Sequence, residues 1–182
     1  IRPNSKEALK RLKKSGVKEF IMLTGDSKSK AQAIAKELGI ENYYAELLPT
    51  DKAKILDEIM LKAAKHGQKV AFVGDGINDA PALVRADIGI GMHKGADIAK
   101  ASADVVLLRD DIEAVADARE LAISCLSKVN NSFKVTVGVN SLILILASLG
   151  RLSPIQTAIA HNGTTIALLL NALRRIRIKK DK

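Results

Sequence analysis

Two long uncharged runs near the end of the chain constrain its fold more than any other feature. Residues 135–150 and 152–173 carry no formal charge, and only Arg151 separates them. A helix needs about 20 apolar residues to cross a bilayer. The second run reaches that length, and the first reaches it when it starts at Val129 and the Lys134 side chain snorkels to the interface. The pattern predicts two transmembrane helices.

The segment between the two runs predicts a helical hairpin. Residues 150–154 read Gly-Arg-Leu-Ser-Pro, a polar turn, so both outer ends of the hairpin are expected on one side of a lipid bilayer. The tail at 174–182 holds six Lys or Arg residues, whereas the turn holds one. By the positive-inside bias, the tail and residues 1–128 are cytoplasmic, in a multi-pass protein of the plasma membrane. Two buried helices of a soluble all-helical subdomain are the alternative.

Composition excludes several other classes of protein. The formal net charge is +9, and the basic tail accounts for much of it, so a nucleic-acid partner is not needed to explain the charge. Aromatic residues are 3% of the chain and Trp is absent, which argues against a base-stacking module. The single cysteine, Cys125, cannot form an internal disulfide or a cysteine-rich metal cage.

Residues 1–128 alternate short apolar runs with amphipathic segments. This order predicts an α/β domain with a Rossmann-like parallel sheet covered on both faces. Gly39 is expected to end the second helix, and Asn4 or Ser5 to cap the first. Strands are expected near residues 20–23, 43–45, 69–73, 88–91 and 105–108, and helices near 5–14, 28–38, 51–65 and 80–84.

Polar residues follow two of these strands directly. The ligand crevice of a parallel sheet lies at the carboxyl ends of its strands, which is where these residues are expected. Glycines beside carboxylates let backbone N–H groups approach an anion, and carboxylate oxygens can hold Mg²⁺. A threonine hydroxyl and a lysine charge suit a phosphate group. The candidate residues of this phosphoryl-transfer site are Thr24, Gly25, Asp26, Lys52, Gly74, Asp75, Gly76, Asn78 and Asp79.

Each of these motifs has a simpler explanation when it is taken alone. Thr-Gly-Asp is a common turn, Gly76 can serve a bulge, and residues 49–52 can be only a helix start with Asp51 near the positive end of the helix dipole. The glycines at 89, 91 and 95 suggest a dinucleotide site, but their spacing does not match that fingerprint. All of these motifs together, in this order along the chain, indicate a function more specifically than any one of them alone.

The ordered set resembles the phosphorylation domain of P-type ATPases, whose core belongs to the haloacid dehalogenase superfamily. The resemblance rests on residues 24–26, 49–52 and above all the decapeptide 74–83, Gly-Asp-Gly-Ile-Asn-Asp-Ala-Pro-Ala-Leu. The Ala-Pro-Ala-Leu ending resembles the heavy-metal-transporting branch. The same branch is indicated by residues 89–92, Ala103-Asp104 and the Asn-Ala-Leu-Arg sequence at 171–174.

The resemblance implies a function and a role for each matching residue. Thr24 and Lys52 would contact an aspartyl-phosphate formed from ATP, and Asp75 would bind Mg²⁺, with Asn78 and Asp79 completing the site. Arg2-Pro3 would match the hinge that precedes the second half of the domain. The chain would then belong to a pump that couples ATP hydrolysis to the movement of a transition-metal ion.

Parts of the family pattern are absent. The Asp-Lys-Thr-Gly-Thr motif with the phosphorylated aspartate does not occur, nor do the nucleotide-binding domain, the actuator domain and the Cys-Pro membrane helix. Without that carboxylate no covalent intermediate forms, so we expect a C-terminal part of a pump, inactive without its N-terminal part. Ser27 replaces a frequent Asn, which should be tolerated. A membrane-anchored phosphatase of the same superfamily and a non-catalytic remnant are the alternatives.

A polar cluster inside the second uncharged run is the candidate site for the transported metal. The sequence His-Asn-Gly-Thr-Thr at 161–165 resembles the branches that handle divalent ions such as Zn²⁺, Co²⁺ or Mn²⁺. Helical spacing places His161, Thr164 and Thr165 on one wall, facing Asn140 of the other helix. The alternative is that these side chains only hydrogen-bond to neighbouring helices as packing contacts.

Overall fold

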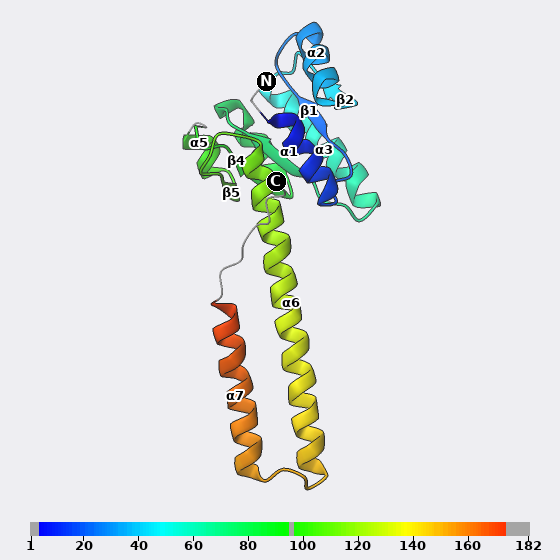
Figure 1. Cartoon of the computed structure of the whole chain (residues 1–182). Coiled ribbons are helices and arrows are strands. Elements are labelled where there is room, and N and C mark those ends of the chain that lie inside the picture. The colour runs from blue at the N-terminus through cyan, green and yellow to red at the C-terminus, as the bar shows by residue number, and fades with distance from the viewer. Residues whose placement is uncertain (1–3, 95–96, 174–182) are drawn as a thin grey trace. The chain divides into compact units, whose positions relative to one another are not determined.

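The computed structural model describes residues 4–94 and 97–173 of the 182-residue chain. The chain divides into two compact units, residues 1–117 and 118–182 (Figure 1). The predicted hinge at Arg2-Pro3, the glycine at position 95 and the basic tail at 174–182 lie outside the described residues.

The first unit alternates helices and strands in the predicted order, and it contains one short helix, Asp97–Ala101, that was not predicted. Most predicted bounds are confirmed to within two residues, and the third strand is shorter at its start. The elements are α1 (Ser5–Lys14), β1 (Ile21–Leu23), α2 (Lys28–Leu38), β2 (Asn42–Tyr44), α3 (Pro49–Lys65), β3 (Ala71–Gly74), a single 3-10 turn (Ile77–Asp79), α4 (Ala80–Arg85), β4 (Ile88–Gly91), α5 (Asp97–Ala101) and β5 (Val105–Val106).

All described strand pairs are parallel, which confirms the predicted fold class. β1 pairs with β2, placing Met22 opposite Tyr43. β4 lies between β3 and β5, placing Ile90 opposite both Val73 and Val105. The strands form one sheet of two and one of three, because β1 and β3 do not pair with each other.

Small residues let the helices pack closely in the core of the first unit. Ala31 and Ala35 are four residues apart in α2, so they share one face, and both are buried. The largest fully buried side chains are Leu56 of α3 and Leu83 of α4. Each buried leucine contributes about 1.5–3 kcal/mol relative to an exposed one.

The helix ends confirm one predicted cap and modify another. Gly39 ends α2 in the left-handed conformation with φ 71°, a conformation that glycine adopts without strain. Asn4 lies at the N-cap of α1, as expected, but its φ is 65° and its side chain makes no capping hydrogen bond.

The second unit contains the hairpin. α6 spans Glu113–Ser148, so it starts well before Val129, and α7 spans Pro154–Ala172. Ser153 caps α7 by accepting a hydrogen bond from the backbone N–H of Gln156, whose side chain accepts one from Ser153 in return. Lys128 Nζ donates to the carbonyl of Ala172 at 3.2 Å. The two helices of this unit therefore lie antiparallel and side by side (Figure 1).

Much of the surface of the hairpin is apolar. Large side chains such as Leu144, Ile159 and Leu169 are more than 60% exposed, which does not fit helices buried inside a soluble subdomain. Among the described helices, α6 alone is long and apolar enough to cross a membrane, with a mean hydropathy of 1.3 over its best 18-residue window. α7 includes the polar Gln156, His161 and Asn162, and its membrane crossing stays a prediction.

Candidate functional site

The turn after β1 is fixed by its own hydrogen bonds. Thr24 Oγ1 accepts from the backbone N–H of Asp26 at 3.1 Å and donates to Asp26 Oδ2 at 3.3 Å. The other carboxylate oxygen of Asp26 accepts from Lys30 Nζ at 2.8 Å. The hydrogen bond from Lys30 lowers the pKa of Asp26 against an opposing effect of burial, and Thr24 lowers it further. Asp26 thus stays ionised and fixes Thr24 at the end of the strand.

The loop after β3 is organised around Asp79. Its Oδ2 accepts from the backbone N–H groups of Asp75 at 3.3 Å and Gly76 at 3.2 Å. Its Oδ1 accepts from Lys52 Nζ at 2.7 Å. Gly74 allows this arrangement, because a Cβ there would lie 2.7 Å from the Cβ of Asp79. One buried carboxylate therefore shapes the loop and positions the lysine.

A hollow of about 310 Å³ joins the two strand ends. Its lining residues are Thr24, Gly25, Asp26, Leu47, Pro49, Lys52 and Asn78. The structure thus brings together predicted residues from three separate stretches of sequence. Gly74, Asp75, Gly76 and Asp79 do not line the hollow, although Asp79 contacts Lys52. Leu47 was not predicted, because a short apolar pair between a strand and a helix carries no functional pattern.

The two carboxylates predicted to hold Mg²⁺ differ in their burial and in the hydrogen bonds that they accept. Asp79 is buried and already accepts from Lys52 and from two backbone N–H groups, whereas Asp75 is exposed. No group of three His, Cys, Asp or Glu side chains among residues 4–94 and 97–173 could hold a metal ion by itself. Mg²⁺ is usually held by one or two carboxylates together with phosphate oxygens and water. Of the two predicted ligands, Asp75 is the more exposed.

In the hairpin, the structure brings His161 together with Asn140. His161 Nδ1 lies 3.0 Å from Asn140 Oδ1. The hydroxyl of Thr164 donates to the carbonyl of Ala160, and that of Thr165 to the carbonyl of His161. Of the residues predicted on this wall, His161 alone meets Asn140, while both threonine hydroxyls are bonded to their own helix.

Two acidic residues hold the three-stranded sheet together at its strand starts. Asp87 accepts from the backbone N–H of Val70 at 2.9 Å and from Lys69 Nζ at 2.7 Å. Asp104 accepts from the backbone N–H of Gly89 at 2.8 Å. The sequence indicates Asp104 only through the family resemblance and carries no signal for Asp87, because the hydrogen-bond partners of both residues are distant in the sequence.

The Asp87 contacts predict an acid dependence of stability. The hydrogen bond from Lys69 lowers the pKa of Asp87, and the hydrogen bond from the backbone N–H of Val70 lowers it further. Burial raises this pKa but is outweighed. Because the pKa of Asp87 is lowered in the folded state, its contacts stabilise the fold fully above the pKa of the unfolded state, about 3.9. This stabilisation is lost as the pH falls through the pKa of the folded state. We therefore expect Asp87→Asn to lower the melting temperature of the whole chain at pH 7, and the difference to shrink below pH 4. Thermal unfolding followed by circular dichroism measures this, and an equal difference at both pH values would contradict it.

Comparison with known proteins first defines the class. Residues 1–87 match the family of haloacid dehalogenase-like hydrolases. The parallel strands and the polar loops at their carboxyl ends agree with that match. The first unit thus has a haloacid dehalogenase-like core.

The whole chain is similar to metal-exporting P-type ATPases. It is 40% identical over 182 residues to the manganese-exporting P-type ATPase of Mycobacterium leprae, covering all of this chain and 25% of that protein. It is 41% identical over 179 residues to the copper-exporting P-type ATPase of Bacillus subtilis, covering 98% of this chain and 22% of that protein. The chain therefore spans about a quarter of the length of these relatives.

A solved structure agrees with both similarities. The crystal structure of a zinc-transporting PIB-type ATPase in the E2.Pi state superposes with a TM-score of 0.83 at 34% identity. The alignment covers 95% of this chain and 28% of that protein. The predicted resemblance to heavy-metal-transporting P-type ATPases is confirmed.

Proposed function

We propose that this chain is the second half of the phosphorylation domain and the last two membrane helices of an ATP-driven transition-metal transporter. In this proposal residues 1–128 are cytoplasmic, residues 129–173 cross the plasma membrane twice, and residues 174–182 form a cytoplasmic tail. The observation that carries it is the hollow that joins Thr24, Lys52 and Asn78 at the ends of parallel strands. A threonine hydroxyl, an ammonium and an amide together suit a phosphoryl group.

The contact with Asp79 places the ammonium group of Lys52 where it can bind phosphoryl oxygens. Its side chain is 15% exposed and that of Asp79 is 11% exposed, so their 2.7 Å ion pair is largely shielded from water. An ammonium carries three donors, and Asp79 occupies one. The other two remain for oxygens of the phosphoryl group, while Asp79 holds the side chain in place. Asp79 thus acts as a positioning residue in this proposal.

Asp75 is the residue that would hold Mg²⁺ in this site. The bound ion would neutralise negative charge on the phosphoryl oxygens. Asn78, which lines the same hollow, can donate its amide N–H to one of those oxygens. The cofactors of the complete reaction are Mg²⁺ and ATP.

The phosphorylated aspartate must come from another part of the protein. The Asp-Lys-Thr-Gly-Thr sequence does not occur in this chain, and none of the strands among residues 4–94 and 97–173 offers an equivalent nucleophile. This argues against the alternative of a membrane-anchored phosphatase that works alone. The required partner is the N-terminal part of the pump.

His161 is the proposed ligand of the transported ion. When Nδ1 of His161 donates to Asn140 Oδ1, its Nε2 presents a lone pair. Neutral imidazole suits divalent ions such as Zn²⁺, Co²⁺ and Mn²⁺. Thr164 and Thr165 would line the path with their helix-bonded hydroxyls.

Reassembly tests the proposal. We expect no ATP hydrolysis by this chain alone, because it carries no phosphorylatable aspartate, and metal-stimulated hydrolysis once it replaces the matching quarter of the M. leprae relative. The measurement is phosphate release from ATP by membranes containing each form. The control is the remaining three quarters of the relative expressed alone. Hydrolysis by this chain alone, or an inactive reassembled pump with normal expression, would contradict the proposal.

A further inference from the structure

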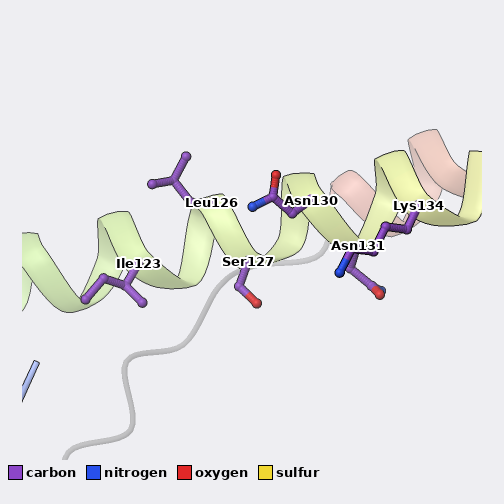
Figure 2. Close-up of a pocket in the computed structure, with 6 residues that line it drawn as sticks. All are labelled: Ile123, Leu126, Ser127, Asn130, Asn131 and Lys134. Atoms are coloured by element: carbon purple, nitrogen blue, oxygen red, sulfur yellow. The ribbon is translucent and has the colours of Figure 1, made fainter.

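One exposed face of α6 carries a hollow that the proposed pump site does not use. The hollow has a volume of about 460 Å³ (Figure 2). Successive lining residues are three or one apart, so all lie along a single face of the helix. We call them the α6 stripe: Ile123, Leu126, Ser127, Asn130, Asn131 and Lys134.

The α6 stripe faces away from α7. The contacts to α7 come from Lys128 and Asn140, and Ile143 is the buried residue of this helix pair. Successive residues are rotated by about 100°, which places Lys134 and Asn130 on the opposite side of α6 from those three. Within the second unit, α7 therefore leaves the stripe open.

The polar side chains of the stripe offer hydrogen-bond donors and no negative charge. The lining residues supply one hydroxyl, two carboxamides and one ammonium, without a carboxylate. All four polar side chains are exposed, and none has a hydrogen bond or ion pair within the described part of the chain. Unpaired donors around a single cation complement an anion with several acceptor oxygens.

The depth of the stripe in the bilayer favours a lipid phosphate. A span of about 20 residues that ends near Leu149 starts near Val129, so Asn130 lies close to the interface. Side chains on a helix lean toward its N-terminus, and lysine reaches back to the headgroups. The ammonium of Lys134 is then expected beside Asn130 and Asn131, at the level of the phosphates.

We propose that the α6 stripe binds the headgroup of an anionic phospholipid in the cytoplasmic leaflet, with Lys134 contacting the phosphate and Asn130, Asn131 and Ser127 donating to its oxygens. This proposal depends on the membrane placement given under Proposed function. A second copy of the chain is a poorer occupant, because facing Lys134 side chains would repel each other. A helix from the rest of the pump is the occupant that the experiment must distinguish.

Lipid selectivity of the whole chain tests the proposal. The chain is placed in nanodiscs of phosphatidylcholine that contain a minor fraction of phosphatidylglycerol, and native mass spectrometry counts the lipids it retains. We expect retention of phosphatidylglycerol over phosphatidylcholine, and a drop of about fivefold in Lys134→Gln, since one basic residue near the surface contributes about that factor. Asn130→Ala with Asn131→Ala should also reduce retention. Lys128→Gln also removes one positive charge, but from the side of α6 that faces α7. This variant should therefore retain the lipid as the parent chain does.

Each result decides between the occupants. Equal retention of both lipids, or equal loss in Lys134→Gln and Lys128→Gln, overturns the headgroup site. Displacement by excess inorganic phosphate would indicate a free-anion site and also overturns it. If phosphatidylglycerol is retained by this chain but not by the reassembled pump, a protein helix covers the stripe and the proposal is wrong. Alkaline extraction of the chain from vesicles would overturn the membrane placement itself, whereas an inserted chain without lipid preference overturns only this inference.

Discussion

Asp75→Ala in the reassembled pump is expected to reduce metal-stimulated ATP hydrolysis by about 1,000-fold or more. The variant removes the exposed carboxylate proposed to hold Mg²⁺, and so the charge neutralisation that phosphoryl transfer requires. Asp79 is not expected to compensate, because it is bound to Lys52 and to the loop backbone. The measurement is the rate of phosphate release at saturating ATP.

Asp97→Ala is the matched control for this prediction. Asp97 is a fully exposed carboxylate of the same unit with only a weak contact to Lys100 at 3.4 Å. Its loss should leave turnover unchanged. Turnover close to that of the parent in Asp75→Ala, with a normal melting temperature, would remove Asp75 from the proposed site.

His161→Ala in the reassembled pump is expected to weaken the apparent affinity for the stimulating metal by about 100-fold or more, because it removes the proposed ligand itself, whereas loss of a contact that only supports a ligand costs about 10- to 100-fold. Phosphorylation of the pump by inorganic phosphate should persist, because that reaction uses residues of the other unit. The measurement is ATP hydrolysis as a function of metal concentration, beside labelling with radioactive phosphate.

Two further variants separate a metal ligand from a packing contact. His66→Ala removes an exposed histidine of the first unit and should leave the metal dependence unchanged. Asn140→Ala removes the partner that orients His161 and should give a smaller shift in the same direction. If both hairpin variants lower thermal stability while metal dependence is unaltered, the interhelical hydrogen bond is a packing contact only.

The sequence was enough to predict which residues form the candidate phosphate site, but not how the surroundings of its two carboxylates differ. In the sequence, Asp75 and Asp79 are two carboxylates four residues apart in one polar loop, and both are candidate Mg²⁺ ligands. In the structure Asp79 is buried and bonded to Lys52, 27 positions away along the chain. That burial and the contact with Lys52 depend on long-range packing, which no local pattern encodes.

The sequence by itself determined the order of helices and strands, the position of the polar loops after β1 and β3, and the long apolar helix. These features follow from short-range physical chemistry: hydrophobic periodicity, glycine at strand and helix ends, and the uncharged length of residues 135–150. The tertiary structure decided which of the predicted wall residues meets Asn140, namely His161, and the face on which Lys134 is left open. Both depend on how α6 and α7 are rotated against each other, which is set by packing between residues distant in the sequence.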